Sequence, residues 1–371
     1  RVAIEEVLDT GLFSSRGLHR MGWAHQTYAE FLAAWYLVQH KISLAHVIEL
    51  ISSFEDPDHK LIPQLHETAA WLASMRADVL QEIIKTDPDV LLRSDVPTDA
   101  NVRSSIVENL LTQYEQEKLF DRDRDNYHNY AKLKHPGLVA QLLPYICDFS
   151  KQIDARDLAI DIAEVCEVHD LQEELVNLAL DSSQSIHLRV RAAKAICSVG
   201  DADMRLKLKL LAVEQILEDE YDQLKGYALQ SLWSDCLTSE ELFQALTPPK
   251  TRNYFGGYSM FLDYKLTPQL QIDDLVVALS WLENQGLRCF ESPFEILGDC
   301  LLLKAWENLN LPKVAEGFTK VALVQWKGHQ GIVTHDDKLQ QQFASSLLND
   351  VQKRRTLIEQ AVLIISKGIF T

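Results

Sequence analysis

Two histidine–aspartate pairs are the residues of this chain that come closest to a catalytic signature. They are His169-Asp170 and His335-Asp336. An imidazole beside a carboxylate, completed by a further His and Asp, could hold the metal ion of an all-helical phosphohydrolase. A helix cap is the competing interpretation, because Gly200-Asp201 takes the place of His169-Asp170 in an internal repeat, and an Asp at such a turn caps backbone amides. We therefore expect no metal site and keep the hydrolase as a minor alternative.

The common catalytic motifs are absent from the sequence. It contains no GxxxxGK[ST], GxGxxG, HExxH, GxSxG or DxDxDG pattern, so nothing predicts a phosphate loop, a zinc helix, a nucleophile elbow or a calcium loop. The six cysteines lie far apart and never form CxxC, which favours buried, reduced thiols in a cytosolic protein. We expect a chain that is not an enzyme, with no catalytic residues and no cofactor of its own.

The charge of the chain limits its partners. Its 54 acidic and 36 basic side chains give a net charge of −18. Nucleic acids and anionic membranes bind positive surfaces, so we expect neither as a partner. No apolar run reaches the roughly 20 residues that span a bilayer, and Arg1 to Glu6 do not resemble a signal peptide. These features predict a cytoplasmic protein, and the start at Arg1 suggests a fragment.

Helical periodicity dominates the sequence after about residue 25. Apolar residues recur at helical spacing over 26–39, 44–51, 65–75, 78–85, 100–117 and 138–147. The best candidate for β structure is residues 11–24, where two short apolar segments flank Ser15-Arg16-Gly17 and predict a hairpin. We expect the dispersed tryptophans to pack between helices, with an aromatic ligand-binding stripe as the alternative.

The middle of the chain contains an internal repeat. Residues 162–170 align with 193–201 at an offset of 31, and residues 227–233 follow about 35 further on. Each is preceded by a short amphipathic segment, so the unit is two helices and a turn, which must stack on its neighbours to bury its apolar face. The segment Leu188 to Ile196 is similar to the HEAT-repeat pattern. We predict an all-α fold, an irregular HEAT-like α-solenoid, continued by helices over 273–284, 293–308, 312–327, 337–349 and 353–366.

One segment interrupts this pattern. The two prolines of Thr247-Pro248-Pro249-Lys250 cannot sit inside a helix, and the following Gly256-Gly257 pair marks a break or a close backbone approach. A ligand-contacting loop is the alternative. The acidic clusters 218–220 and 121–125 predict solvated loops or helix faces.

A longer resemblance lies near the start of the chain. Residues 23–37, WAHQTYAEFLAAWYL, resemble the phrase F-x-H-x-T-x-x-E-F-L-A-A-x-Y-L that closes the winged-helix region of NACHT-type STAND ATPases. The hairpin at 11–23 is similar in place and length to the wing of that domain. A looser resemblance reaches about residue 115 and includes 67–72 and 87–92. Trp23 departs from the pattern, because the family usually has Phe there.

The resemblance implies that the chain is the downstream part of a signalling ATPase, and we expect a bacterial one. The family's P-loop and Walker B residues precede the winged helix, which agrees with their absence here. The family's winged-helix histidine, which faces the nucleotide phosphates and helps hold the closed, ADP-bound state, corresponds to His25. The alternative is that His25 caps the following helix or packs in the wing. Helical repeats in this family act as sensors and autoinhibitory lids, and bacterial members are linked to anti-phage defence.

Together these observations predict three regions. Residues 1–40 would end a winged-helix domain carrying the β-hairpin, 41–130 would form a helical connector, and 131–371 a HEAT-like sensor domain. The sensor would recognise a protein trigger and control the ATPase module, whose ATP or ADP belongs to the longer protein, and activation could produce an oligomer. The alternatives are a standalone helical-repeat scaffold for protein binding and, less favoured, the His-Asp hydrolase.

Overall fold

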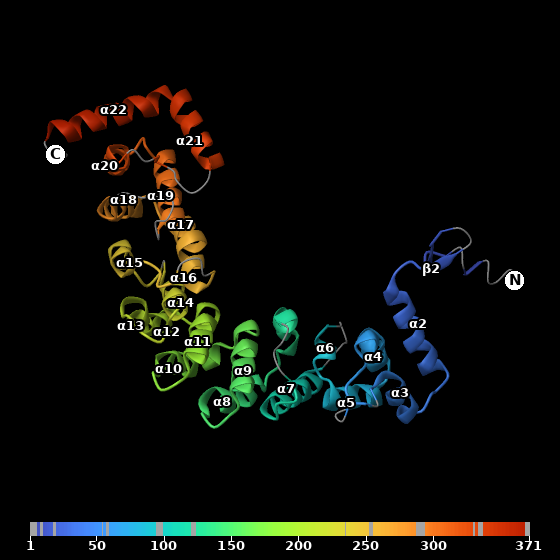
Figure 1. The fold of residues 1–371 in the computed structure, drawn as a ribbon. Helices are drawn as coiled ribbons and strands as arrows, with labels where there is room; N and C mark the ends of the chain where they lie inside the picture. Colours follow the sequence, from blue (N-terminus) through green and yellow to red (C-terminus); the bar gives the residue numbers. More distant parts are fainter. Residues whose placement is uncertain are drawn as a thin grey trace. The chain divides into compact units, whose positions relative to one another are not determined.

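The structure of this chain is a computed structural model that describes residues 6–7, 10–17, 20–53, 55–56, 59–93, 99–119, 124–233, 235–251, 255–286, 294–328, 331–332 and 337–367. Helices hold most of these residues, as predicted (Figure 1). The chain divides into two compact units, unit 1 from Arg1 to Leu171 and unit 2 from Gln172 to Thr371. This division does not coincide with the boundaries expected after residues 40 and 130, and the three-region organisation stays a prediction.

Unit 1 begins with the predicted β-hairpin. Strands β1 (Phe13–Ser15) and β2 (Met21–Trp23) pair antiparallel, with Phe13 opposite Trp23. The two rings stack at 4.6 Å between centroids, a cross-strand contact that fixes the register. The remaining elements of unit 1 are α2 (Gln26–Gln39), α3 (Leu44–Ile51), η1 (Pro63–Leu65), α4 (His66–Met75), α5 (Ala77–Thr86), α6 (Val90–Arg93), α7 (Ala100–Glu115), η2 (Arg124–Leu133), α8 (Leu138–Cys147), α9 (Ile153–Val165) and η3 (His169–Leu171).

The regular elements in the described part of unit 2 are all helices, joined by turns and loops. Its elements are α10 (Gln172–Leu180), α11 (Ile186–Val199), α12 (Ala202–Lys207), α13 (Lys209–Val213), α14 (Gln223–Leu232), α15 (Ser239–Ala245), α16 (Gly257–Met260), the π-helical turn η4 (Phe261–Lys265), α17 (Leu266–Gln269), α18 (Asp274–Asn284), α19 (Glu295–Glu307), α20 (Pro312–Lys327), α21 (Asp337–Asn349) and α22 (Val351–Ser366). Helix α11 packs against both α10 and α14. Ala192, Ala193 and Ala195 are fully buried there.

The internal repeat is visible as a turn that occurs twice. After α8, the Asp148 carboxylate accepts hydrogen bonds from the amide and the hydroxyl of Ser150. After α10, Asp181 accepts the same two bonds from Ser183. Each turn leads into a helix, α9 or α11, so each unit consists of two helices joined by a turn, as expected from the sequence.

A buried arginine repeats along with this turn. Arg156 in α9 donates to the carbonyls of Tyr145 and Ile146 at the end of α8, and Arg189 in α11 donates to Ala179 O at the end of α10. These contacts satisfy carbonyls that a helix end leaves without partners. Arg156 and Arg189 therefore occupy equivalent positions in the two units, and they lie farther apart in the sequence than the offset of 31 residues that the sequence alignment gave. The reason is the exit from α9, which runs through Glu167 at a positive φ and through η3, whereas α11 ends directly at Gly200.

Several expectations about burial were only partly correct. Trp233 and Trp306 are buried, but Trp35 and Trp326 are 46% and 43% exposed. Among the described cysteines, Cys166 is buried, and burial raises the pKa of its thiol to about 11, whereas Cys147 is exposed. Cys289 lies outside the described residues. Exposure depends on which neighbours cover a side chain, and helical spacing alone does not identify them.

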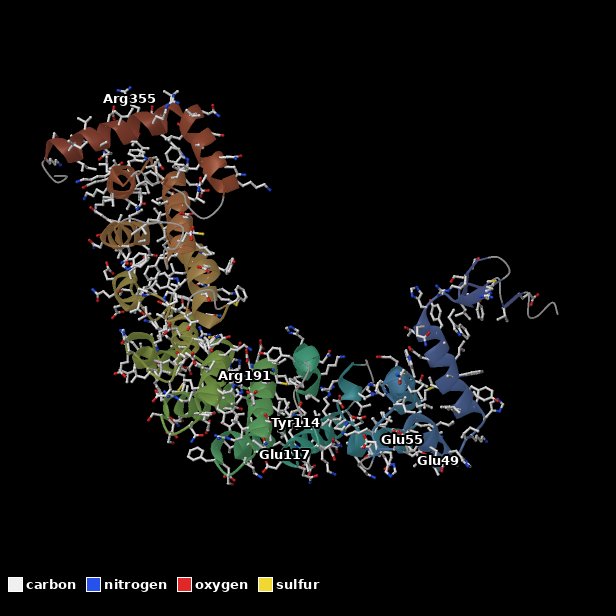
Figure 2. All side chains as sticks on the ribbon, in the orientation of Figure 1. Glu49, Glu55, Tyr114, Glu117, Arg191 and Arg355 are labelled. Carbon is white, nitrogen blue, oxygen red and sulfur yellow. The ribbon has the colours of Figure 1, made fainter. Side chains whose placement is uncertain are left out.

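The last helix also has an uncovered side. Arg355 points outward from α22 (Figure 2) and pairs with Glu359 at 2.8 Å.

Within the described ranges, no helix is long and apolar enough to cross a membrane.

Candidate functional site

The predicted site residue His25 lies between the hairpin and α2. It is the N-cap residue of α2 in an extended conformation, and its carbonyl accepts a hydrogen bond from the Tyr28 amide. Its side chain makes no capping hydrogen bond, and the imidazole is exposed, meeting the Tyr28 ring edge-on at 5.7 Å. His25 therefore lies at the N-cap position of α2, as the alternative expected, although its ring makes no capping hydrogen bond. The phosphate-facing role of the exposed imidazole stays a prediction.

Helix α2 exposes most of its apolar side chains. Ala34 is buried, but Tyr28, Phe31 and Trp35 are 37%, 37% and 46% exposed. Their spacing places these three rings on one face of the helix, and only Phe31 contacts a ring on another helix, Trp71, edge-on at 5.2 Å. Exposed apolar faces of this kind usually belong to interfaces. An imidazole that can donate a hydrogen bond and an aromatic face thus lie on the same short segment.

The histidine–aspartate pairs do not form a metal site among the described residues. His335 and Asp336 lie outside the described residues, and His169-Asp170 forms the short helix η3. The part of the chain that the structure describes contains no group of three His, Cys, Asp or Glu side chains that could hold a metal ion. Asp201, the repeat partner of Asp170, accepts a hydrogen bond from the Met204 amide at 2.9 Å and caps α12. The capping interpretation is thus confirmed at Asp201.

The predicted break gives rise to a second candidate, a polar cavity in unit 2. Helix α15 ends at Ala245 and α16 begins at Gly257, as the prolines and glycines required. The segment between them packs against residues 211–225 and encloses a cavity of about 170 Å³. The lining residues are Leu211, Glu214, Gln215, Ile216, Asp219, Asp222, Lys225, Thr247, Pro248 and Lys250.

Two buried aspartates organise this cavity. Asp219 accepts hydrogen bonds from the amides of Gln223 and Lys225, at 2.8 and 3.1 Å, and so anchors the start of α14. Burial raises the pKa of Asp219, while these amides act in the opposite direction. Asp222, at φ 52°, accepts from the Lys250 amide at 2.7 Å and lies 3.4 Å from its ammonium. That ammonium also donates to the carbonyls of Ile216 and Asp219. The loop is thereby fixed to the turn before α14.

A buried lysine completes the polar network. The Lys225 ammonium donates to Thr247 Oγ1 at 2.7 Å and lies 5.4 Å from the centre of the Tyr258 ring. Burial lowers the pKa of Lys225, since charge is costly away from water. The Tyr258 hydroxyl donates to Thr247 O at 2.6 Å. This network can position the loop and shape the surface around the cavity.

The sequence pattern did not indicate that Asp219 and Asp222 are buried and hold the loop and the start of α14 in place. The cluster 218–220 was expected to be solvated, and Glu218 and Glu220 are indeed exposed, but Asp219 is only 3% exposed. The physical reason is that a carboxylate placed just before a helix can satisfy the amides of its first turn. The position of Asp219 shortly before the predicted helix at 227–233 was the available signal.

No protein-family model, curated protein or solved structure matches this chain.

Proposed function

We propose that this chain is the regulatory and sensor region of a NACHT-type STAND signalling ATPase. In this proposal the hairpin and α2 close a winged-helix domain whose ATPase module is encoded upstream. The repeated helices form an irregular HEAT-like α-solenoid that binds a protein trigger in the cytoplasm, with anti-phage defence as the proposed setting. The chain itself would hydrolyse no ATP.

The observation that carries this proposal is the arrangement of the segment that resembles the family. His25 follows β2 after one residue, its imidazole is exposed, and the helix after it presents the rings of Tyr28, Phe31 and Trp35 to solvent. A helix whose packing partners all lay within this chain would be expected to bury such an apolar face. We infer that the face packs on the ATPase module and that His25 donates a hydrogen bond to a nucleotide phosphate there.

The repeated turns support the sensor part of the proposal. Asp148 and Asp181 form the same turn, and Arg156 and Arg189 hold the same helix ends. Stacked units of this kind provide extended surfaces for binding proteins. A standalone helical scaffold would share these repeats, so the N-terminal segment is the feature that separates the two candidates.

The test is ADP retention in the protein that joins an ATPase module to this chain. His25→Ala should speed ADP release by roughly 10- to 100-fold, which corresponds to the loss of one hydrogen bond to a charged group. His40→Ala is the matched control, because His40 is exposed at the other end of α2 and packs on Tyr36. Equal ADP release from both variants would exclude the phosphate role of His25 and favour the standalone scaffold. ATP turnover by the chain alone would exclude the regulatory role.

A further inference from the structure

Unit 2 exposes an apolar stripe on α12 and α13. Leu206, Leu210 and Val213 recur at helical spacing, and Leu208, which joins the two helices, keeps helical backbone, so the three side chains lie on one face. They are 47%, 58% and 52% exposed, and Leu217 in the following turn is 85% exposed. On the other side, Leu208 and Leu211 are buried. We call Leu206, Leu210, Val213 and Leu217 the leucine stripe.

The same segment continues into the polar cavity. Leu211 and Ile216, which alternate with the leucine stripe along the chain, line the cavity together with Glu214. Single exposed apolar side chains are ordinary on protein surfaces, but three leucines and a valine that follow one another beside a cavity form a patch suited to a partner. The contacts of Lys250 with Ile216 O and Asp219 O hold this segment in place, so the surface is preformed.

The charge around the leucine stripe is negative. Glu214, Glu218 and Glu220 are exposed, and none of them forms an ion pair with another described residue. The exposed Lys207 lies at the other end of the leucine stripe, beside Leu206, and the Lys209 ammonium pairs with Glu241 at 2.6 Å. The Lys250 ammonium contacts two carbonyls and Asp222, and the Lys225 ammonium is buried against Thr247, so the negative charge is concentrated at the Val213–Leu217 end of the stripe. The chain as a whole carries a charge of −18.

We propose that the leucine stripe and its three glutamates dock a basic amphipathic helix of a partner protein. Apolar side chains of that helix would cover the leucines, and its lysines or arginines would face Glu214, Glu218 and Glu220. A second copy paired through this face about a two-fold axis would bring like-charged glutamates together, which opposes that occupant. Nucleic acids and anionic membranes carry the same sign of charge as this surface.

This inference deepens the proposed sensor function and rests on it for its biological meaning, since the docked helix would belong to the trigger. Its test measures peptide binding by this chain alone. A negative result there would leave the His25 experiment unaffected, and an unchanged ADP release in that experiment would leave the docking surface unaffected.

The test uses a fluorescein-labelled peptide of roughly 18 residues built only from Leu and Lys at helical spacing, long enough to lie along such a surface. Fluorescence anisotropy with the whole chain should show saturable binding that weakens as salt rises from about 50 to about 300 mM, because ion pairs are screened. A Leu and Glu peptide of the same pattern should bind at least about tenfold more weakly. Equal binding of both peptides, or no saturable binding of the Leu and Lys peptide, would overturn the proposal.

Two double variants locate the binding on this surface. Leu210→Ser with Leu217→Ser, and Glu214→Lys with Glu218→Lys, should each weaken binding of the Leu and Lys peptide by at least about tenfold. The matched control joins Leu348→Ser to Glu307→Lys, because both side chains are exposed elsewhere in unit 2, and it should bind like the original chain. Circular dichroism checks that each variant keeps its helices. Loss of binding in the control equal to that in the double variants would overturn the proposal.

Discussion

Gly226 is the position where unit 2 should be most sensitive to a single added methyl group. It lies in the middle of α14, where alanine normally favours the helix by about 1 kcal/mol over glycine. A Cβ at this position would lie 2.2 Å from the Tyr258 amide nitrogen and 2.4 Å from Gly257 C, far below the 3.4 Å at which ordinary contact begins. The atoms it would meet belong to the backbone of α16, which cannot turn aside as a side chain can.

The size of the destabilisation can be estimated from the contacts of α16 that the added methyl group would disturb. Moving Tyr258 outward disturbs a ring that is 1% exposed and stretches its hydrogen bond to Thr247 O, now 2.6 Å. Overpacking of this kind costs roughly 1 to 3 kcal/mol and a weakened hydrogen bond about 1 more, against a gain of about 1 in helix propensity. Gly226→Ala should therefore lower the free energy of unfolding by about 1 to 3 kcal/mol.

Thermal unfolding monitored by circular dichroism measures this effect. For a unit of this size, at about 2 to 4 °C per kcal/mol, we expect the midpoint to fall by roughly 2 to 12 °C. Gly137→Ala is the control, because its Cβ would meet only His135 ring atoms at 3.5 Å, an ordinary contact. An unchanged or raised midpoint for Gly226→Ala, with Gly137→Ala also neutral, would refute the close approach of α14 and α16.

Three further changes test other parts of the structure. Burial and the neighbouring Asp89 raise the pKa of Asp87 from 3.8 to about 7. Because the folded chain binds this proton more tightly than the unfolded chain, the free energy of unfolding should fall as pH rises from about 4 to about 7. Asp87→Asn should reduce this pH dependence in urea titrations at several pH values. Thr238→Ala removes the capping box with Glu241 and should cost about 1 kcal/mol in the same assay, whereas Thr238→Ser should not. Tyr258→Phe leaves Thr247 O without its donor and should cost roughly 1 to 3 kcal/mol, and an equal midpoint would contradict that hydrogen bond.

Local sequence determined much of the fold. Apolar spacing predicted α2 and α8 with their observed bounds, and the Ser15-Arg16-Gly17 turn predicted the hairpin. Pro248, Pro249 and the paired glycines predicted the break before α16. These features follow from neighbouring residues, because backbone conformation and the three-to-four-residue repeat of a helix are set over short distances.

Only the tertiary structure decided which of these surfaces are covered. Leu210 and Val213 have the spacing of a core-facing stripe, yet they are exposed, whereas Asp219 sits in an acidic cluster and is buried. His25 could equally have capped α2 with its ring, and its exposure follows from how the hairpin joins the helix. Whether an apolar or charged side chain meets solvent depends on segments far away in the sequence, such as Lys250 against Asp222, and no local pattern contains that information.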